Sequence, residues 1–434
     1  MTGVATGLLG LAILLFLLAI RIPVAFAMFI VGFFGIAALN GWNAATGLLA
    51  SEAFTLGSSP ELVVVPLFIL MGNVASITGM SRQLYDAAYA VVGSIKGGLA
   101  SATVIGCGGF AALSGSSVAS ALTMGKVALA EMNRFKYDKR LSTGVVAAGG
   151  TLGILIPPST GFVIYAILTE QSIGRLFLAG VLPGILLLCL FVLAVTVICY
   201  LRPGYGPAGP TTTLPQKLRA VAGAGPIVGV ILLTIGGIYG GLFSPVEAAA
   251  VGAGTVVLIG FFTRTLNIRQ LWDACKDSIA TTATVMLILI AAHMINPFIA
   301  LSHIPTHVGE FITWLDLPTV GVLILIVVIY LILGCFLEGF AMMVLTLPIF
   351  FPIIIDLGID PIWFGVLVVL SLEMGLISPP VGLNVFIVKS VAPDVSLGEI
   401  FNGVILFWVM MLLTLVILIA FPQIALFLPD TMIN

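Results

Sequence analysis

Long apolar stretches without a single acidic or basic side chain recur along the whole chain, separated by short polar segments. These stretches are residues 22–51, 97–125, 141–169, 177–201, 220–246 and 400–429. A helix of roughly 20 apolar residues crosses the hydrocarbon core of a bilayer, and each of these stretches is longer than that. The pattern therefore predicts an all-α polytopic protein whose helices cross a membrane many times.

The composition supports this class and excludes others. Of the 434 residues, 60% are apolar and 8% are charged, whereas soluble domains carry about 25% charged residues. The mean hydropathy is +1.26. These values exclude a soluble enzyme, a secreted disulfide scaffold and a nucleic-acid-binding protein. The sequence has no nucleophile–base pair, phosphate loop or haem-ligating pair of histidines, so we expect neither catalysis nor a bound cofactor.

Two interrupted helices carry the same motif 222 residues apart. The first reads GILIPPSTG from Gly153, and the second reads GLISPPVGLN from Gly375. Proline lacks a backbone N–H and its ring clashes with the preceding turn, so a Pro–Pro pair breaks a helix. Other matches, such as Pro23 with Pro245, have the same shift. Together these matches predict an internal repeat.

We divide the chain into two repeats joined by a polar linker rich in Pro, Gly and Thr, which favour turns over helices. Re-entrant hairpins are expected where the motifs SGSSV and EGFAMM interrupt apolar stretches. The predicted parts are repeat 1 at 1–200, the cytoplasmic linker at 201–222, repeat 2 at 223–434, hairpins at 97–133 and 318–355, and broken helices at 141–168 and 361–390.

The distribution of cations predicts the orientation in the membrane. With the N-terminus outside and one hairpin in each repeat, every Lys and Arg except Arg175 lies on, or returns towards, the cytoplasmic side. The opposite orientation would place nearly all of them outside. The two repeats then cross the membrane in opposite directions. Inverted repeats with discontinuous helices are typical of secondary transporters.

The two breaks are candidate binding positions. Carbonyls before each Pro pair lose their helical partners and can coordinate a cation, while the half-helix after the break turns its N-terminus towards the midplane. Ser159 is placed to cap the half-helix after the first break. Gly382 and Asn384 follow the second break. A kink that only shapes helix packing is the alternative, but its recurrence in both repeats favours a functional role.

Small hydroxyl residues and intramembrane acids add candidate chemistry. SGSSV at 114–118 supplies hard oxygen ligands that suit an alkali cation, with close helix packing as the alternative. A carboxylate at the bilayer centre costs about 2.5–3.5 kcal/mol on insertion scales, so such acids indicate function. Glu338 and Glu373 lie beside the predicted second hairpin tip and break. Glu247 is equally consistent with a simple helix cap.

In this order, the motifs resemble the large membrane subunit of a tripartite ATP-independent periplasmic (TRAP) transporter, the kind made separately from its small membrane partner. The matching stretches are RIPVAFAM (21–28), PLFILMGN (66–73), SGSSVA (114–119), GGTLGILIPPS (149–159), SPVEAAAVG (244–252), LGCFLEGFA (333–341), LPIFFP (347–352), GIDPIWFG (358–365) and LEMGLISPPVGLNVFI (372–387). They cover nearly the full length. Glu338 departs from the family pattern, in which many members have Asp.

The resemblance implies an elevator-type secondary transporter of the bacterial inner membrane, with a periplasmic N-terminus. In each repeat, scaffold helices and a surface arm would support the moving hairpin and broken helix. The implied activity is Na⁺-coupled uptake of a carboxylate-bearing organic acid of the dicarboxylate, sialic acid or 2-oxo acid class. The implied partners are a small four-helix membrane subunit, a periplasmic substrate-binding protein and membrane lipid, with no nucleic acid. Na⁺ would be the coupling ion.

Two other functions are consistent with the same residues. One is an autonomous Na⁺- or H⁺-coupled organic anion carrier of the same architecture that needs no partner. The other is a membrane-anchored subunit, for example of a redox complex, that transports nothing. Genes for a four-helix protein and a secreted binding protein beside this one would favour the partner-dependent carrier.

The juxtaposition of hairpin and break in each repeat leads to a predicted set of site residues. The predicted Na⁺ ligands are Ser114, Ser116, Gly149, Gly150, Gly153, Glu338, Gly339, Met342, Gly375 and Ser378. The predicted substrate-binding residues are Ser116, Ser117, Ser159, Thr160, Gly382 and Asn384.

Overall fold

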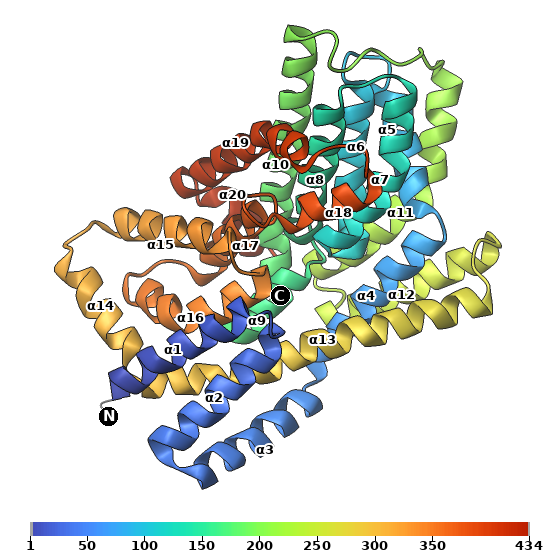
Figure 1. The fold of residues 1–434 in the computed structure, drawn as a ribbon. Helices are drawn as coiled ribbons and strands as arrows, with labels where there is room; N and C mark the ends of the chain where they lie inside the picture. The colour runs from blue at the N-terminus through green and yellow to red at the C-terminus, as the bar shows by residue number, and fades with distance from the viewer. Residues whose placement is uncertain (1–2, 433–434) are drawn as a thin grey trace.

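Twenty α-helices and one short 3-10 helix make up residues 3–432, the part of the chain that the computed structural model describes (Figure 1). This range contains no β-strand. The first half comprises α1 (Gly3–Ala19), α2 (Val24–Asn40), α3 (Trp42–Ser58), η1 (Pro60–Val63), α4 (Val64–Ile77), α5 (Met80–Val92), α6 (Gly98–Ser114), α7 (Ser117–Arg134), α8 (Lys139–Leu155), α9 (Thr160–Thr169) and α10 (Ile173–Leu201). The second half comprises α11 (Leu214–Tyr239), α12 (Pro245–Phe262), α13 (Ile268–Leu301), α14 (Ile304–Trp314), α15 (Thr319–Gly334), α16 (Gly339–Asp356), α17 (Pro361–Gly375), α18 (Leu383–Val391), α19 (Leu397–Ala420) and α20 (Gln423–Asp430). The extreme N-terminus, predicted to be periplasmic, lies outside the described residues.

Seven helices among residues 3–432 are long and apolar enough to cross a bilayer by themselves. They are Pro60–Ile77, which joins η1 to α4, and α10, α11, α12, α13, α16 and α19. The pair α8 and α9, bent by 40° at its break, makes an eighth span when the two are counted together. Five shorter apolar helices of 10–17 residues accompany them. The predicted all-α polytopic class is confirmed.

Two helix pairs fill the segments for which hairpins are predicted. α6 and α7 meet at Gly115, whose φ of 59° lies in the left-handed region that favours glycine. α15 and α16 meet at the turn that ends with Glu338. Ser116 and Glu338 are the N-cap residues of α7 and α16, and they are 222 residues apart. The returning helix of each pair therefore begins at an equivalent position.

The helix pairs that contain the Pro–Pro motifs also correspond. Asp138 caps α8 by accepting two backbone N–H groups of the first turn, and Asp360 caps α17 in the same way. α8 and α17 end at Leu155 and Gly375, before their Pro pairs, because proline cannot continue the helical hydrogen bonds. Both Pro–Pro bonds are cis. The correspondence between the halves thus extends from sequence motifs to helix caps.

α13, the longest helix, supports a peripheral group of helices. Figure 1 shows it along one edge of the molecule, running from the side of α12 to α14. Its C-terminal part forms an apolar cluster with α1, α2 and α3, while other residues of α13 join the larger cluster around α6, α8 and α17. Gly32 of α2 packs closely on α13, since a Cβ there would stand 2.6 Å from the backbone of Met294. Two apolar clusters therefore meet along one long helix.

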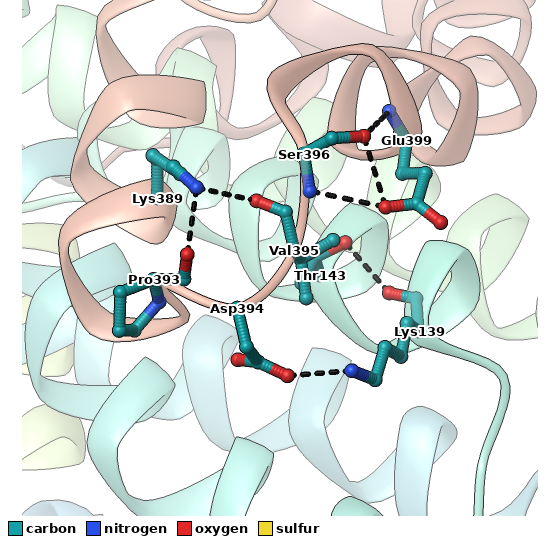
Figure 2. A network of polar contacts seen from close by, with 8 residues as sticks. All are labelled: Lys139, Thr143, Lys389, Pro393, Asp394, Val395, Ser396 and Glu399. Carbon is teal, nitrogen blue, oxygen red and sulfur yellow. Dashed lines mark hydrogen bonds and ion pairs between the residues drawn. The ribbon is translucent and has the colours of Figure 1, made fainter.

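Polar contacts tie the turn between α18 and α19 to the start of α8 (Figure 2). Lys139 Nζ donates to the Asp394 carboxylate at 2.6 Å, and Lys389 Nζ donates to the carbonyls of Pro393 and Val395. The Lys139 hydrogen bond holds the pKa of the Asp394 carboxyl below its ordinary value. The contact therefore adds stability at neutral pH, which is lost as the pH falls through the folded-state pKa of Asp394. The effect is small because both side chains are about half exposed.

The linker between the halves is shorter than predicted. The sequence predicts it over 201–222, but α11 already begins at Leu214. Gln216 Oε1 accepts the Thr213 N–H at 2.9 Å, and Pro215 in the first turn is compatible with a helix start. The polar residues that follow are therefore part of α11, and the linker proper is residues 202–213.

This linker is bonded to the ends of α5, α6 and α8. The Gly97 N–H donates to the Gly206 carbonyl at 2.9 Å, and the Gly209 N–H donates to the Gly93 carbonyl at 3.0 Å. The Asp138 N–H donates to the Tyr205 carbonyl at 3.0 Å. The segment acts as a strap across one face of the helices rather than as a loose connection.

Replacing Tyr137 by Phe is expected to destabilise this strap. The buried Tyr137 hydroxyl donates to the Pro207 carbonyl at 2.8 Å and accepts the Leu99 N–H at 3.2 Å. Its removal leaves a buried donor unpaired, which costs about 1–3 kcal/mol. We expect a lower melting temperature for the detergent-solubilised variant. Tyr205→Phe, which removes a contact with exposed Arg202 only, is the matched control, and equal melting temperatures would contradict the role of Tyr137.

Candidate functional site

A cavity of about 450 Å³ lies where the two hairpin tips face α4 and α13; we call it the central cavity. Its polar lining consists of Asn73, Ser114, Ser116, Ser117, Thr160, Thr281 and Glu338. Apolar side chains, including Ile154, Phe340 and Leu372, cover the remaining walls. A more apolar hollow of about 690 Å³ shares Glu338 and Phe340 with it and reaches the start of α2. Predicted site residues of both repeats therefore border one space.

The first hairpin tip is held in place by the first broken helix. Thr160 Oγ1 donates to the Gly115 carbonyl at 2.9 Å, and a Cβ on Gly115 would stand 2.6 Å from the Pro158 carbonyl oxygen. Ser116 Oγ accepts the Ala119 N–H at 3.3 Å and so caps α7. The tip is therefore fixed against the break, with the N-terminus of α7 at the cavity wall.

A buried hydrogen bond joins the two halves behind the cavity. Ser117 Oγ donates to Glu373 Oε2 at 2.7 Å, and both side chains are almost inaccessible. Glu373 Oε1 has no hydrogen-bond partner among the described residues. The sequence marks Glu373 as an intramembrane acid but leaves it out of the predicted ligands, because nothing local pairs it with a serine 256 residues away. It is the main addition that the structure makes to the site.

Asn384 extends this buried group. Its side-chain amide donates weakly to the Ala147 carbonyl at 3.4 Å, while its Oδ1 is buried without a partner among residues 3–432. A Cβ on Gly150 would stand 3.1 Å from the Ser117 carbonyl oxygen and 3.2 Å from the Asn384 amide nitrogen. Asn384 and Ser117 therefore flank the same glycine. Oxygens of this kind are hard donors that suit an alkali cation.

Glu338 stands at the second hairpin tip and caps α16. Its Oε2 accepts the Ala341 N–H at 3.1 Å, the same contact that Ser116 makes 222 residues earlier. The end of α15 crosses the end of α17 closely, since a Cβ on Gly375 would stand 2.6 Å from the Gly334 carbonyl oxygen. The second tip and the second break are therefore neighbours. Glu338 reaches the central cavity, but Glu373 is the acid inside the packed core.

The structure places the predicted site residues in two groups. Those that line the central cavity are Ser114, Ser116, Ser117, Thr160, Glu338 and Gly339. The others lie behind its walls or at helix ends, namely Gly149, Gly150, Gly153, Ser159, Met342, Gly375, Ser378, Gly382 and Asn384. Gly149 and Gly153 of the second group allow close helix packing. Gly149 faces Cys107, and a Cβ on Gly153 would stand 2.5 Å from the Ser116 carbonyl oxygen. Their small size lets the broken helices approach the hairpins.

Two serines of the second group, Ser159 and Ser378, serve local structure. Ser159 Oγ caps α9 through the Phe162 N–H at 3.3 Å. Ser378 Oγ donates to the Met374 carbonyl and accepts the Trp408 indole N–H at 2.9 Å. These contacts satisfy the hydroxyl groups within the protein.

Two polar residues of the cavity are absent from the sequence prediction. Asn73 lies on α4 and donates to Ser278 Oγ of α13 at 2.9 Å. Thr281 lies one turn further along α13 and also lines the cavity. An amide in an otherwise apolar helix is the only local signal for Asn73. The second wall of the cavity is thus supplied by helices outside the hairpins and breaks.

The sequence matches the family described as "Tripartite ATP-independent periplasmic transporter, DctM component" over residues 11–424. The chain belongs to this family. A relative in Pseudomonas aeruginosa, named C4-dicarboxylate TRAP transporter large permease protein DctM, is 38% identical, with 88% of this chain and 89% of the relative covered. These similarities identify a transport protein rather than an enzyme, and the predicted resemblance is confirmed.

Two further comparisons extend this result. The isethionate TRAP transporter permease protein DctMQ of Oleidesulfovibrio alaskensis is 33% identical over 94% of this chain, which covers 64% of that longer protein. The crystal structure of the Alcanivorax borkumensis YdaH transporter has a similar fold, with a TM-score of 0.62, 15% identity and 88% of both chains covered. The family is therefore shown by sequence, and the transporter fold also by structure.

Proposed function

We propose that this TRAP large permease carries a carboxylate-bearing organic acid into the cell together with Na⁺. The observation that carries the proposal is the central cavity, which has the N-termini of α7 and α16 at its wall. Each helix N-terminus acts as about half a positive charge and favours an anion. A relative named for C4-dicarboxylate supports this substrate class, and one named for isethionate, a sulfonate, supports the anionic charge alone.

The buried oxygens of Ser117, Glu373 and Asn384 support a Na⁺ site behind the first hairpin tip. Two of these oxygens have no partner among the described residues, and a bound cation would satisfy them. Here Ser117 and Asn384, which were predicted as substrate-binding residues, and Glu373 are added to the predicted Na⁺ ligands. Na⁺ beside the cavity would offset the charge of the substrate during the crossing.

The packing supports an elevator movement of the hairpins and broken helices as one unit. α6, α7, α8, α17 and α18 are joined by close glycine crossings and by the Ser117–Glu373 bond. α1, α2 and α3 form an apolar cluster with α13, to which Val344 and Leu345 of α16 also belong. We propose that this second group stays fixed in the membrane.

The distribution of cations supports one orientation of the chain. With the face that bears Arg82, Lys126 and Arg134 in the cytoplasm, the N-terminus is periplasmic, as the cation distribution predicts.

A small four-helix subunit and a periplasmic binding protein complete the proposed carrier. α3 exposes large apolar side chains such as Trp42 and Phe54, the latter 76% accessible, which suits a lipid-embedded or subunit-covered scaffold. The name of the isethionate relative, DctMQ, is consistent with a large permease joined to another part.

Uptake by the chain alone tests the proposed partners. Proteoliposomes that contain only this chain, under an inward Na⁺ gradient, are expected to accumulate no substrate. Adding the small subunit and the loaded binding protein is expected to start uptake. The acid to be used is first identified by thermal-shift screening of the binding protein. Uptake that needs neither partner would favour an autonomous carrier. Uptake at the same rate without a Na⁺ gradient would contradict coupling to Na⁺.

Variants of Glu338 separate its charge from its capping bond. In Glu338→Gln the amide oxygen can still accept the Ala341 N–H, so α16 keeps its cap. We expect this variant to fold but to lose Na⁺-driven uptake, and Glu338→Asp to retain part of it. The measurement is initial uptake in proteoliposomes containing the complete carrier. Full activity of Glu338→Gln would reduce Glu338 to a helix cap.

A further inference from the structure

A second polar cavity, of about 330 Å³, lies between α5 and α7; we call it the α5–α7 cavity. Its lining comprises Arg82, Tyr85, Asp86, Tyr89, Leu99, Lys126, Val127, Ala130 and Glu131. Figure 1 shows α5, α6 and α7 side by side, away from α1 and α3. None of these lining residues borders the central cavity or was predicted as a site residue. The α5–α7 cavity is therefore distinct from the central cavity.

The two cavities follow the same face of α7. Val118 and Leu122 line the central cavity, and Lys126 and Ala130 line the α5–α7 cavity. A spacing of four residues keeps side chains on one face of a helix. Moving along α7 from its N-cap thus leads from the central cavity to the α5–α7 cavity, on the face of the molecule proposed to be cytoplasmic.

A contact between two hydroxyl groups involves the part of α7 between the residues that line the two cavities. Ser76 Oγ, at the end of α4, lies 3.3 Å from Thr123 Oγ1 of α7. Thr123 follows Leu122 of the central cavity and precedes Lys126 of the α5–α7 cavity.

The charges of the α5–α7 cavity favour an anion. Arg82 and Lys126 form no ion pair within residues 3–432, whereas Glu131 is 3.9 Å from Arg134. The lining contains two cations and two carboxylates, and among these four groups only Glu131 has an ion-pair partner in residues 3–432. Burial raises the pKa of the Asp86 carboxyl, although the Arg82 charge opposes this. Arg82 and Lys126 therefore have no ion-pair partner among the described residues and can attract an anion.

Tyr85 provides a donor that no protein group satisfies. The side chain is 2% exposed, lines the cavity, and its hydroxyl has no partner among the described residues. Burial, and next the charge of Glu131, raise the pKa of this hydroxyl, so it stays protonated. A buried, unpaired O–H on a residue that lines the same cavity as two unpaired cations is suited to bind a carboxylate or a similar oxyanion.

We propose that the α5–α7 cavity is a second carboxylate-binding site, which receives the substrate after it passes Ser76 and Thr123 and before it reaches the cytoplasm. The identity of the anion rests on the proposed function. The attraction of an anion to the cavity rests only on the charges that line it. Arg82 and Lys126 would attract the carboxylate, and the Tyr85 hydroxyl would donate to it. Asp86 and Glu131, which also line the cavity, would keep the binding weak enough for release.

Cysteine labelling tests the site without requiring transport. Ala130→Cys places a thiol in the cavity of the complete carrier, in a background with Cys189, Cys275 and Cys335 replaced by Ser because they are not fully buried. The probes are the anionic thiosulfonate MTSES and the cationic MTSET. The matched control is Gln83→Cys, an exposed position of α5 outside the cavity lining.

We expect the ratio of MTSES to MTSET rates to be about 3- to 10-fold higher at position 130 than at position 83, because cations raise the local anion concentration. Arg82→Gln with Lys126→Gln should abolish this excess, and Asp86→Asn should not lower it. Succinate should slow MTSES labelling at position 130 more than chloride of equal ionic strength. Equal ratios at the two positions, or no protection by succinate, would overturn the proposal.

Transport measurements separate this proposal from the proposed function. Arg82→Gln with Lys126→Gln is expected to lower the maximal uptake rate several-fold while leaving the half-saturating concentration of loaded binding protein unchanged, because release and not capture is affected. An anion preference at position 130 in a carrier that shows no Na⁺-driven uptake would refute the proposed function and leave the anion site standing. Normal maximal uptake by the double variant would refute a role in release.

Discussion

Glu373→Gln is expected to abolish Na⁺-driven uptake while leaving the protein folded. The carboxylate is buried, and one oxygen accepts the Ser117 hydroxyl while the other has no partner among the described residues. Gln keeps an acceptor for Ser117 but loses the negative charge. Removing one partner of a buried charged interaction costs about 3–5 kcal/mol. We therefore expect the initial uptake rate to fall at least about 100-fold.

Two serine variants provide the controls for this result. Ser117→Ala removes the contact with Glu373 and is expected to raise the Na⁺ concentration needed for half-maximal uptake. Ser371→Ala changes another buried serine of the same helix as Glu373, but its hydroxyl donates only to the Leu367 carbonyl. This variant should behave like the parent. Normal Na⁺ dependence in both Glu373→Gln and Ser117→Ala would exclude this pair from the ion site.

Gly153→Ala and Gly375→Ala are expected to lower the stability of the protein strongly. A Cβ at these positions would stand 2.5 Å from the Ser116 carbonyl oxygen and 2.6 Å from the Gly334 carbonyl oxygen. Both obstacles are backbone atoms, so the helices themselves must separate. Overpacking of a tight core typically costs about 1–3 kcal/mol. We expect a lower melting temperature and a lower yield of monodisperse protein after detergent extraction.

Gly254→Ala is the matched control for these substitutions. Gly254 also lies within a helix, α12, but a Cβ there would meet nothing within 4 Å. Alanine is the better helix former, so this variant should be as stable as the parent or slightly more so. If Gly153→Ala and Gly375→Ala matched Gly254→Ala in melting temperature, the close crossings of hairpins and broken helices would not be needed for stability.

Local features of the sequence were enough to predict some of the helices that cross the membrane, such as α10, α11 and α19. The charge-free stretches do not include the spans Pro60–Ile77, α12 and α13. A charge-free stretch is predictive because an apolar segment must form its backbone hydrogen bonds internally in lipid. The helix breaks could also be predicted, because a Pro–Pro pair interrupts a helix wherever it occurs. In the structure α8 and α17 end before their Pro–Pro pairs. The repeat followed from counting along the chain. The end of the linker was misplaced because a helix cap at Thr213 outweighs the polar composition that follows it.

The site itself could be predicted only in part. The sequence predicted ligands at both hairpin tips, and in the structure Ser116, Ser117 and Glu338 line one cavity. Their roles stay a prediction. The sequence could not distinguish a glycine that supplies a carbonyl to a ligand from one that lets two helices touch. The role of Gly153 depends on where Ser116 lies, because a Cβ on Gly153 would contact the Ser116 carbonyl. The packing of the hairpin on the broken helix determines that position.

The sequence by itself determined the kind of element, the helix breaks and the recurrence of motifs, because these depend on the solvation and bonding of neighbouring residues. Only the tertiary structure decided which polar groups meet. Ser117 and Glu373 are 256 residues apart, and Asn73 and Ser278 are 205 apart, so no local pattern links them. Their contacts arise because buried polar groups need partners, and the packing of the two halves determines which partners lie within reach.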